Sequence, residues 1–154
     1  MTNNLHIGQK ASFRKTITDA DVLLFSAISG DLNPLHIDSV FASGTKFERR
    51  IAHGMLASSL LSAVIGMKLP GPGTVYISQT LNFLKPVYID DTICAEVEIV
   101  EITQKPPRIR LRTICRNQHN ECVLEGEALV KPQNTSQEKG TIDVPKDLFV
   151  KLET

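Results

Sequence analysis

The chain has 154 residues, of which 42% are hydrophobic and 22% charged, and its 17 basic and 17 acidic side chains cancel to a formal charge of zero. These values are typical of one folded domain with a real core, and the lack of a basic excess argues against a nucleic-acid partner. No apolar run reaches the ~18 residues that a bilayer span requires, and the start of the chain lacks a signal-peptide core, so we expect no membrane partner. The three cysteines, Cys94, Cys115 and Cys122, lack CxxC spacing, which predicts reduced thiols in a cytoplasmic protein and no zinc site.

The first elements are a strand and a helix. Residues 10–17 alternate between apolar and polar side chains, as a half-buried strand does. Thr18 and Asp21 form an acidic variant of the capping box, which predicts a helix over 19–29. Gly30 ends that helix, because a left-handed residue costs glycine least.

A short turn follows, and then a long helix. The residue before proline is pushed out of the helical region, so Asn33 and Pro34 predict that Asp31 and His36 lie on a turn. Asp38 caps a short helical piece over 39–43. Residues 54–68 carry apolar side chains on nearly every side, which predicts a central helix buried all round, ended by the Pro and Gly residues of 69–73.

Alternating segments over 74–84, 92–102, 108–116 and 121–130 predict four further strands, and the short links between the last three predict antiparallel hairpins. Their outward side chains run Glu, Arg, Glu across three successive strands, which favours a structural charge ladder over a phosphate-binding patch. The order of elements therefore predicts an α+β fold in which an antiparallel sheet curls around one long helix. We expect the domain to span 1–131, and 132–154 to form a polar link and a tail of uncertain structure.

Asp31, His36 and the helix beginning at Gly54 form the candidate site. A carboxylate and an imidazole that share a water make an acid/base pair, and backbone N–H groups at a helix start stabilise a developing negative oxygen. That combination suits addition of water to, or its removal from, a double bond conjugated with a carbonyl. Taken singly, Asp31 is also a common turn residue and His36 an ordinary, partly buried histidine.

The segment 25–38, FSAISGDLNPLHID, closely resembles the signature of the MaoC-like (R)-specific enoyl-CoA hydratases, the hydratase 2 group of the hot-dog fold. The resemblance continues through Phe47-Glu48 and 51–56 (IAHGML), and through Leu69-Pro70-Gly71, Leu81-Asn82-Phe83, Pro86-Val87 and Gly126-Glu127-Ala128. It covers about residues 8–131. The motif around Asp31 is specific, whereas the strand similarities would be weak by themselves.

The resemblance implies a hot-dog fold and a role for each matching residue. Asp31 and His36 would be the catalytic pair and hold the water that adds to C3 of a trans-2-enoyl thioester. Asn33 would brace the turn or contact that water, and the backbone N–H of Gly54 would bind the thioester oxygen. It also implies a homodimer, an acyl-CoA or acyl carrier protein thioester as substrate, the (R) configuration of the 3-hydroxyacyl product, and no cofactor.

Three further residues carry open interpretations. His53 caps or shapes the start of the helix, and this structural role is favoured over a chemical one. Ser62, like Ser58 and Ser59, is expected to bond back to a carbonyl of the preceding turn, and as a candidate substrate contact it would face the acyl pocket. Arg50 stands where family members usually carry proline, which would alter the approach to the helix start or place a cation near an incoming carrier.

Three other functions compete with an enoyl-CoA hydratase in fatty-acid metabolism. A hot-dog thioesterase would aim the activated water at the thioester carbonyl, and the Asp-x-Asn-Pro-x-His turn argues against it. A 3-hydroxyacyl-[acyl-carrier-protein] dehydratase differs only in the carrier. A non-catalytic acyl-thioester-binding module is disfavoured because Asp31 and His36 are both intact.

Overall fold

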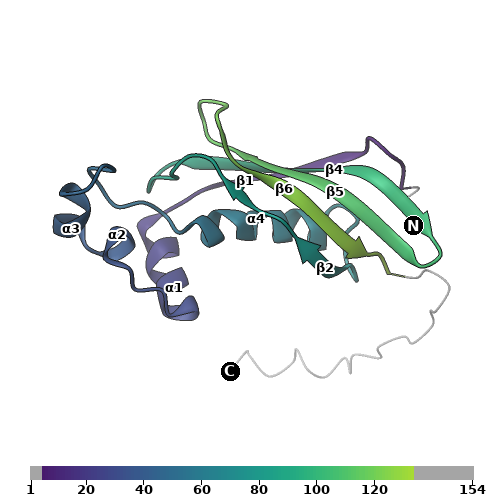
Figure 1. Cartoon of the computed structure of the whole chain (residues 1–154), viewed down its shortest axis with the longest axis horizontal. Coiled ribbons are helices and arrows are strands. Elements are labelled where there is room, and N and C mark those ends of the chain that lie inside the picture. The colour runs from purple at the N-terminus through teal and green to yellow at the C-terminus, as the bar shows by residue number, and fades with distance from the viewer. Residues whose placement is uncertain (1–4, 134–154) are drawn as a thin grey trace, which may run out of the picture.

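The computed structural model describes residues 5–133. One antiparallel sheet forms a curved layer, and the longest helix runs along its concave side (Figure 1). This is the hot-dog arrangement of the α+β class that the sequence predicted. The expected tail over 134–154 lies outside the described residues.

The sheet has six strands in the order β1-β4-β5-β6-β2, and β3 pairs with β6. Their bounds are β1 Lys10–Thr16, β2 Val75–Gln79, β3 Asn82–Phe83, β4 Thr92–Gln104, β5 Pro107–Arg116 and β6 Cys122–Lys131. The hairpins predicted from the short links are confirmed, since β4 pairs with β5 and β5 with β6, both antiparallel.

Four helices lie between β1 and β2, namely α1 Asp19–Ser29, α2 Pro34–Ile37, α3 Ser39–Ser43 and α4 Gly54–Met67. The capping box of α1 is confirmed, because Asp21 N–H donates to the Thr18 hydroxyl and Thr18 N–H donates to the Asp21 carboxylate. Helices α1, α2 and α3 project from one end of the sheet (Figure 1). No helix in the described part of the chain is long and apolar enough to cross a membrane.

The core lies between α4 and the inner face of the sheet. From α4 come Leu60, Leu61, Val64 and Ile65, all at most 5% exposed. The inward strand residues predicted from the alternation are buried against them: Ile93, Ala95, Val97, Ile99, Ile109, Leu111, Cys115, Leu124, Ala128 and Val130. Burial of this apolar area drives the folding of the domain and fixes the position of α4.

The expectation that α4 is buried all round is wrong. Met55 and Met67 are 55% and 73% exposed, and Ser59 and Ser62 lie on the same exposed stripe. The sheet covers only one side of α4, and nothing else in the described chain covers the other side (Figure 1). The apolar side chain of Ile28 on α1 is likewise uncovered, at 83% exposed.

The single strand expected over 74–84 is also wrong, because the chain breaks into β2 and β3. At the break, Thr80 N–H donates to the Glu127 carbonyl, and the Thr80 backbone lies directly against Gly126 of β6, where a side chain would not fit. The apolar residues Val75, Ile77 and Phe83, expected to face inward, are 60%, 46% and 53% exposed. Among residues 5–133, β2 is an edge of the sheet, with no strand on its outer side.

The charge ladder on the outer face is confirmed. Arg112 contacts Glu98 at 2.7 Å, and Arg110 contacts Glu101 and Glu127 at 3.0 and 3.5 Å. Arg110 and Arg112 thus have carboxylate partners on neighbouring strands. The other two arginines of the row donate to backbone carbonyls, Arg108 to Pro107 and Arg116 to Asn120, so the row is accounted for without a ligand.

Candidate active site

The turn after α1 aims the Asp31 carboxylate. Gly30 has φ 77° and ends α1 in the left-handed region, with its N–H donating to Ser26 O. Asp31 N–H then donates to Ser29 Oγ, and Asp31 Oδ1 accepts from Asn33 N–H. These bonds leave Oδ2 available, on a side chain that is 50% exposed.

Asn33 and Pro34 begin the helix that carries His36. The Asn33 side chain accepts a hydrogen bond from Leu35 N–H, and Pro34 occupies the first helical position, where its missing N–H costs nothing. His36 therefore lies on the one-turn helix α2, not on the irregular turn that the sequence predicted. The turn-bracing role expected of Asn33 is supported by its hydrogen bond to Leu35.

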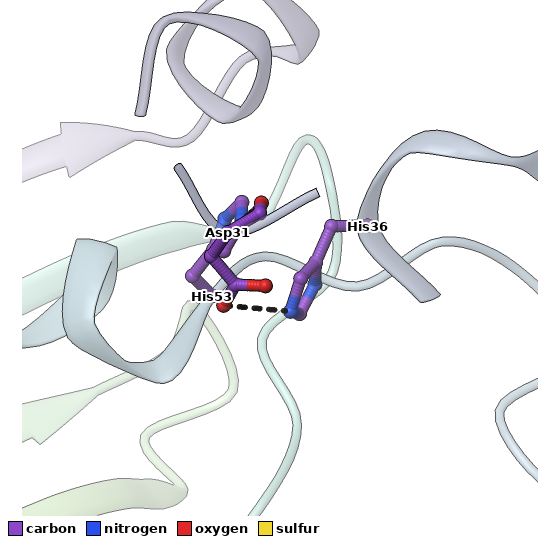
Figure 2. A group of neighbouring side chains, drawn as sticks. All are labelled: Asp31, His36 and His53. Atoms are coloured by element: carbon purple, nitrogen blue, oxygen red, sulfur yellow. Dashed lines mark hydrogen bonds and ion pairs between the residues drawn. The ribbon is translucent and has the colours of Figure 1, made fainter. Parts of the chain in front are cut away.

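His36 presents one nitrogen to Asp31. Its Nδ1 donates to the Ile51 carbonyl at 2.8 Å, and because a carbonyl only accepts, the neutral ring keeps its lone pair on Nε2. Nε2 lies 4.0 Å from Asp31 Oδ2 (Figure 2). This separation is too long for a direct hydrogen bond and suits one water that donates to both atoms.

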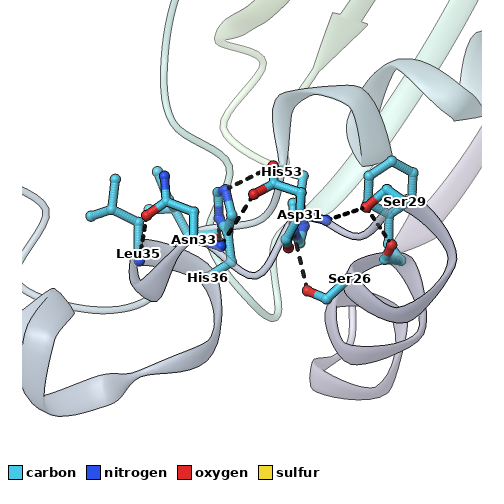
Figure 3. A network of polar contacts seen from close by, with 9 residues as sticks. Ser26, Ser29, Asp31, Asn33, Leu35, His36 and His53 are labelled. Atoms are coloured by element: carbon cyan, nitrogen blue, oxygen red, sulfur yellow. Dashed lines mark hydrogen bonds and ion pairs between the residues drawn. The ribbon is translucent and has the colours of Figure 1, made fainter.

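His53 joins the two segments that make the site. Its Nε2 lies 3.1 Å from the Asp31 carbonyl, to which it donates, and 3.2 Å from the Ser26 hydroxyl (Figure 3). Burial lowers the pKa of His53 below its ordinary value, and the adjacent His36 lowers it further, while the bond to Asp31 opposes the shift. His53 is thus a neutral, buried connector. It sits at the N-cap position of α4 but makes no capping hydrogen bond, so the capping half of the expectation is wrong.

The start of α4 is open. In the part of the chain that the structure describes, the Gly54 N–H has no acceptor, and no side chain caps the first turn. A Cβ at Gly54 would lie 2.7 Å from the Phe83 ring, so only glycine fits without movement of that ring. A helix start with unpaired N–H groups stabilises a negative oxygen placed there.

Ser62 does not join this group. It lies on the exposed stripe of α4, and its hydroxyl makes no hydrogen bond to any of the described residues. The back-bonding expected of the α4 serines is present at Ser58 and Ser59, which donate to Met55 O and Leu56 O.

A cavity of about 460 Å³ adjoins the start of α4. Gly54 and Ile51 both line it, whereas Asp31 and His36 do not, and His36 is joined to it only through its hydrogen bond to the Ile51 carbonyl. Its walls are largely apolar, with Phe47, Leu84 and Val87 among them.

Arg50, the residue that departs from the family pattern, forms an ion pair with Asp19 at 2.6 Å. The Arg50 side chain is only 20% exposed, and it ties the segment before Ile51 to the first turn of α1. It does not line the cavity beside Gly54.

The donor atoms of Asp31, His36 and His53 lie within 4.8 Å of one another, a spacing compatible with an ion site. His53 cannot ligate an ion through Nε2, because that nitrogen donates its proton to the Asp31 carbonyl. Without this nitrogen, only Asp31 and His36 Nε2 remain on the shared face, fewer than the three protein ligands of a catalytic zinc site. The other ring nitrogen of His53, Nδ1, is buried and has no hydrogen-bond partner among the described residues.

Sequence reasoning missed Ser26, the Ile51 carbonyl and Phe83. Ser26 is 2% exposed and follows Val22 by one helical turn, so its helical spacing from a core residue was a usable signal. The other two lie in segments that carry the family resemblance, but their contacts with His36 and Gly54 arise only in the folded chain and could not be found from the sequence.

Comparison with known proteins identifies the family of this chain. The model of the MaoC like domain matches residues 2–117. The chain is 48% identical over 128 residues to a 3-hydroxybutyryl-CoA dehydratase from Methylorubrum extorquens, covering 83% of this chain and 81% of that one. It is 44% identical over 128 residues to an (R)-specific enoyl-CoA hydratase from Aeromonas caviae, covering 83% and 96%.

The solved structure of the (R)-hydratase from A. caviae superposes with a TM-score of 0.83 at 42% identity, covering 86% of this chain and all of the other. The turn that carries Asp31 and His36 and the helix that starts at Gly54 both lie within the matched residues. This chain is therefore a member of the MaoC-like domain family, with a hot-dog fold.

Proposed function

We propose that this chain is an (R)-specific enoyl-CoA hydratase, a hydro-lyase that adds water reversibly to trans-2-enoyl thioesters and forms (R)-3-hydroxyacyl thioesters. The observation that carries the proposal is the 4.0 Å separation of Asp31 Oδ2 from His36 Nε2, close to a helix start with an unpaired N–H. The names of the two relatives describe this reaction in its two directions, hydration and dehydration. The name of the A. caviae relative supports the (R) configuration of the product.

The geometry supports a stepwise account. A water between Asp31 and His36 donates one hydrogen bond to each side chain. Asp31 then removes one proton from this water as the water oxygen bonds to C3, and the other O–H becomes the product's hydroxyl group. The π electrons of the C2–C3 bond shift toward the thioester carbonyl, and the Gly54 N–H stabilises the resulting enolate oxygen. The pair then returns a proton to C2, which restores its own charge and completes the addition of H and OH.

The test is loss of the conjugated absorbance of a short trans-2-enoyl-CoA. Asp31→Asn keeps the size of the side chain and removes the base, so hydration should fall by about 10²- to 10⁴-fold. Asp38→Asn is the matched control, because Asp38 caps α3 through Val40 and Phe41 and lies outside the pair. Undiminished hydration by Asp31→Asn contradicts the proposed site.

The same assay tests two of the three competing functions, the thioesterase and the binding module. A thioesterase would release free thiol from the enoyl-CoA, whereas a hydratase leaves the thioester intact. A binding module would do neither. Hydration without thiol release therefore excludes both alternatives.

We also infer a homodimer. In the part of the chain that the structure describes, the outer edge of β2 has no strand beside it, and the uncovered side of α4 exposes Met55 and Met67. An unpaired edge strand rich in Val and Ile is a template for pairing with a second copy of the same strand. Both surfaces lie on the same side of the fold (Figure 1).

A cytoplasmic location is part of the proposal. The three cysteines are free thiols, and burial raises the pKa of Cys115 to about 12, so that this thiol stays protonated and unreactive. Free thiols are the rule in reducing compartments.

A further inference from the structure

The cavity beside Gly54 has an unusual charge pattern. Most of its lining is apolar, and the two charged side chains that line it are both lysines, Lys46 and Lys85. Among the described residues, no carboxylate lines it. An apolar cavity that bears only cationic charge suits a ligand with a neutral arm and an anionic end.

One part of this cavity adjoins the reaction centre. Gly54, whose N–H would bind the thioester oxygen, lines it, and so does Ile51, whose carbonyl orients His36. A thioester placed at Gly54 can therefore extend its neutral carrier arm along walls formed by Phe47, Leu84 and Val87.

Lys46 and Lys85 are both available for an anion. Lys46 is exposed, lies 5.1 Å over the Phe47 ring, and has no carboxylate partner within residues 5–133. Lys85 contacts Glu121 at 2.6 Å, but the two side chains are 50% and 43% exposed. Ion pairs this exposed contribute little, so a doubly charged ligand can compete for Lys85.

The neighbouring arginines, Arg49 and Arg50, contact other side chains and do not line this cavity. Arg50 is paired with Asp19, and Arg49 lies 4.2 Å over the Tyr88 ring. Arg49 and Arg50 line a different cavity, which they share with Glu48 and Asp90. The two lysines are therefore the cations that a carrier in the cavity beside Gly54 would meet.

We propose that Lys46 and Lys85 form a phosphate site that binds the phosphate of a phosphopantetheine arm whose thioester lies at Gly54. This inference rests on the proposed function and names how the same site recognises its substrate's carrier. The phosphopantetheine arm is common to coenzyme A and to acyl carrier protein, so the site recognises what the two carriers share.

The experiment compares three thioesters of the same enoyl group, on pantetheine, on 4′-phosphopantetheine and on coenzyme A. Pantetheine lacks the phosphate and is otherwise the same arm. In Lys46→Ala and in Lys85→Ala, we expect kcat/KM to fall on the order of tenfold for the two phosphorylated substrates, because each variant loses a charge-assisted contact. The pantetheine substrate should react as it does with the unaltered protein.

Lys10→Ala is the matched control, since Lys10 is an exposed lysine of β1 that pairs with Glu96 and Glu98 on the outer face. It should leave all three substrates unaffected. Glu121→Gln offers a change in the opposite direction, because it frees Lys85 and should lower KM for the phosphorylated substrates only.

Equal losses on all three thioesters, or no loss on any, would overturn the phosphate site. So would a loss confined to coenzyme A, because the contact would then lie beyond the arm's phosphate. The enoyl thioester of an acyl carrier protein distinguishes the carriers: the unaltered protein's kcat/KM identifies the one it prefers, and the lysine variants should weaken both.

Failure of the proposed function is separable from failure of this inference. If the unaltered protein hydrates none of the thioesters, the proposed function fails. The lysines can then still be tested by calorimetry, with saturated acyl-phosphopantetheine and saturated acyl-pantetheine as ligands. The unaltered protein should bind the phosphorylated compound more tightly, and the double variant Lys46→Ala, Lys85→Ala should bind the two compounds equally. Equal binding of the two compounds by the unaltered protein overturns the inference.

Discussion

The imidazole rings of His36 and His53 lie against each other, with centroids 3.8 Å apart and planes inclined by 33°. His53 also donates to the backbone carbonyl of Asp31. One buried ring thus touches both members of the proposed catalytic pair, and it directly precedes Gly54 in the chain. His53 therefore sets the spacing between the acid/base pair and the helix start without contacting the reacting atoms.

Replacing His53 should lower kcat because it displaces Asp31 and His36 relative to each other. In His53→Gln an amide can still donate to the Asp31 carbonyl, but it cannot stack on His36, so the 4.0 Å separation of the pair is no longer maintained. A displacement of about 1 Å in such a site lowers rate on the order of 100-fold. We expect kcat for enoyl-CoA hydration to fall by roughly 10- to 100-fold, with KM changed much less.

Ser26→Ala is the control for this variant. It removes one contact of His53 Nε2 and leaves the bond to Asp31 and the stack in place, so kcat should fall much less. Unchanged kcat in His53→Gln, or a loss that appears only in KM, would contradict the positioning role.

The burial of His53 also predicts a pH dependence of stability. Because its pKa is lowered in the folded state, below about pH 6.5 the unfolded chain binds a proton that the folded chain does not. The stabilisation contributed by neutral His53 is therefore complete above pH 6.5 and is lost as the pH falls toward the folded-state pKa. Urea unfolding at about pH 7.5 and about pH 5.5 should show a larger loss for the natural chain than for His53→Gln.

His119→Gln serves as the comparison, since His119 is exposed in the link between β5 and β6. This variant should lose as much stability on acidification as the natural chain does. An identical loss in His53→Gln would show that His53 titrates alike in the folded and unfolded states.

We predict that full activity requires glycine at position 54, because the Phe83 ring leaves no room for a side chain there. The new methyl group of Gly54→Ala would lie 2.7 Å from the ring, so either Phe83 or the first turn of α4 must move. Displacement of the N–H that binds the enolate oxygen should lower kcat by about 10²- to 10³-fold. The double variant Gly54→Ala, Phe83→Ala should recover much of the rate, and failure to recover would show that the methyl group acts through something other than Phe83.

Much of the fold could be predicted because local chemistry determines it. Thr18, Asp21 and Gly30 delimit α1 by capping and by left-handed backbone, and the alternation over β4 to β6 identifies the residues that face the core. Such signals lie within a few residues of one another in the sequence. They need no knowledge of what packs against them.

The errors have a shared cause. The sequence predicts an interior position for apolar residues of α4 and β2, such as Met55 and Ile77, which are exposed in the structure. A sequence shows which side chains are hydrophobic, but it does not show which surfaces of a helix or strand other elements cover. The site divides in the same way. The motif predicts that Asp31, Asn33 and His36 lie together, whereas the open start of α4 depends on a capping bond that His53 does not make. The contacts of Ser26 and Phe83 arise only when distant segments meet.

The exposed outer edge of β2 is predicted to form the dimer interface. Ile77 is 46% exposed on β2, at the edge where a second copy would pair. Ile77→Lys places a charge there, and charged edge residues oppose strand pairing. Light scattering of the natural chain should give the mass of a dimer, and Ile77→Lys should shift it toward the monomer. Val40→Lys, an equal change at a residue that is 84% exposed on α3, should leave the dimer intact. A monomeric natural chain would refute the dimer, and a dimer that persists in Ile77→Lys would move the interface away from β2.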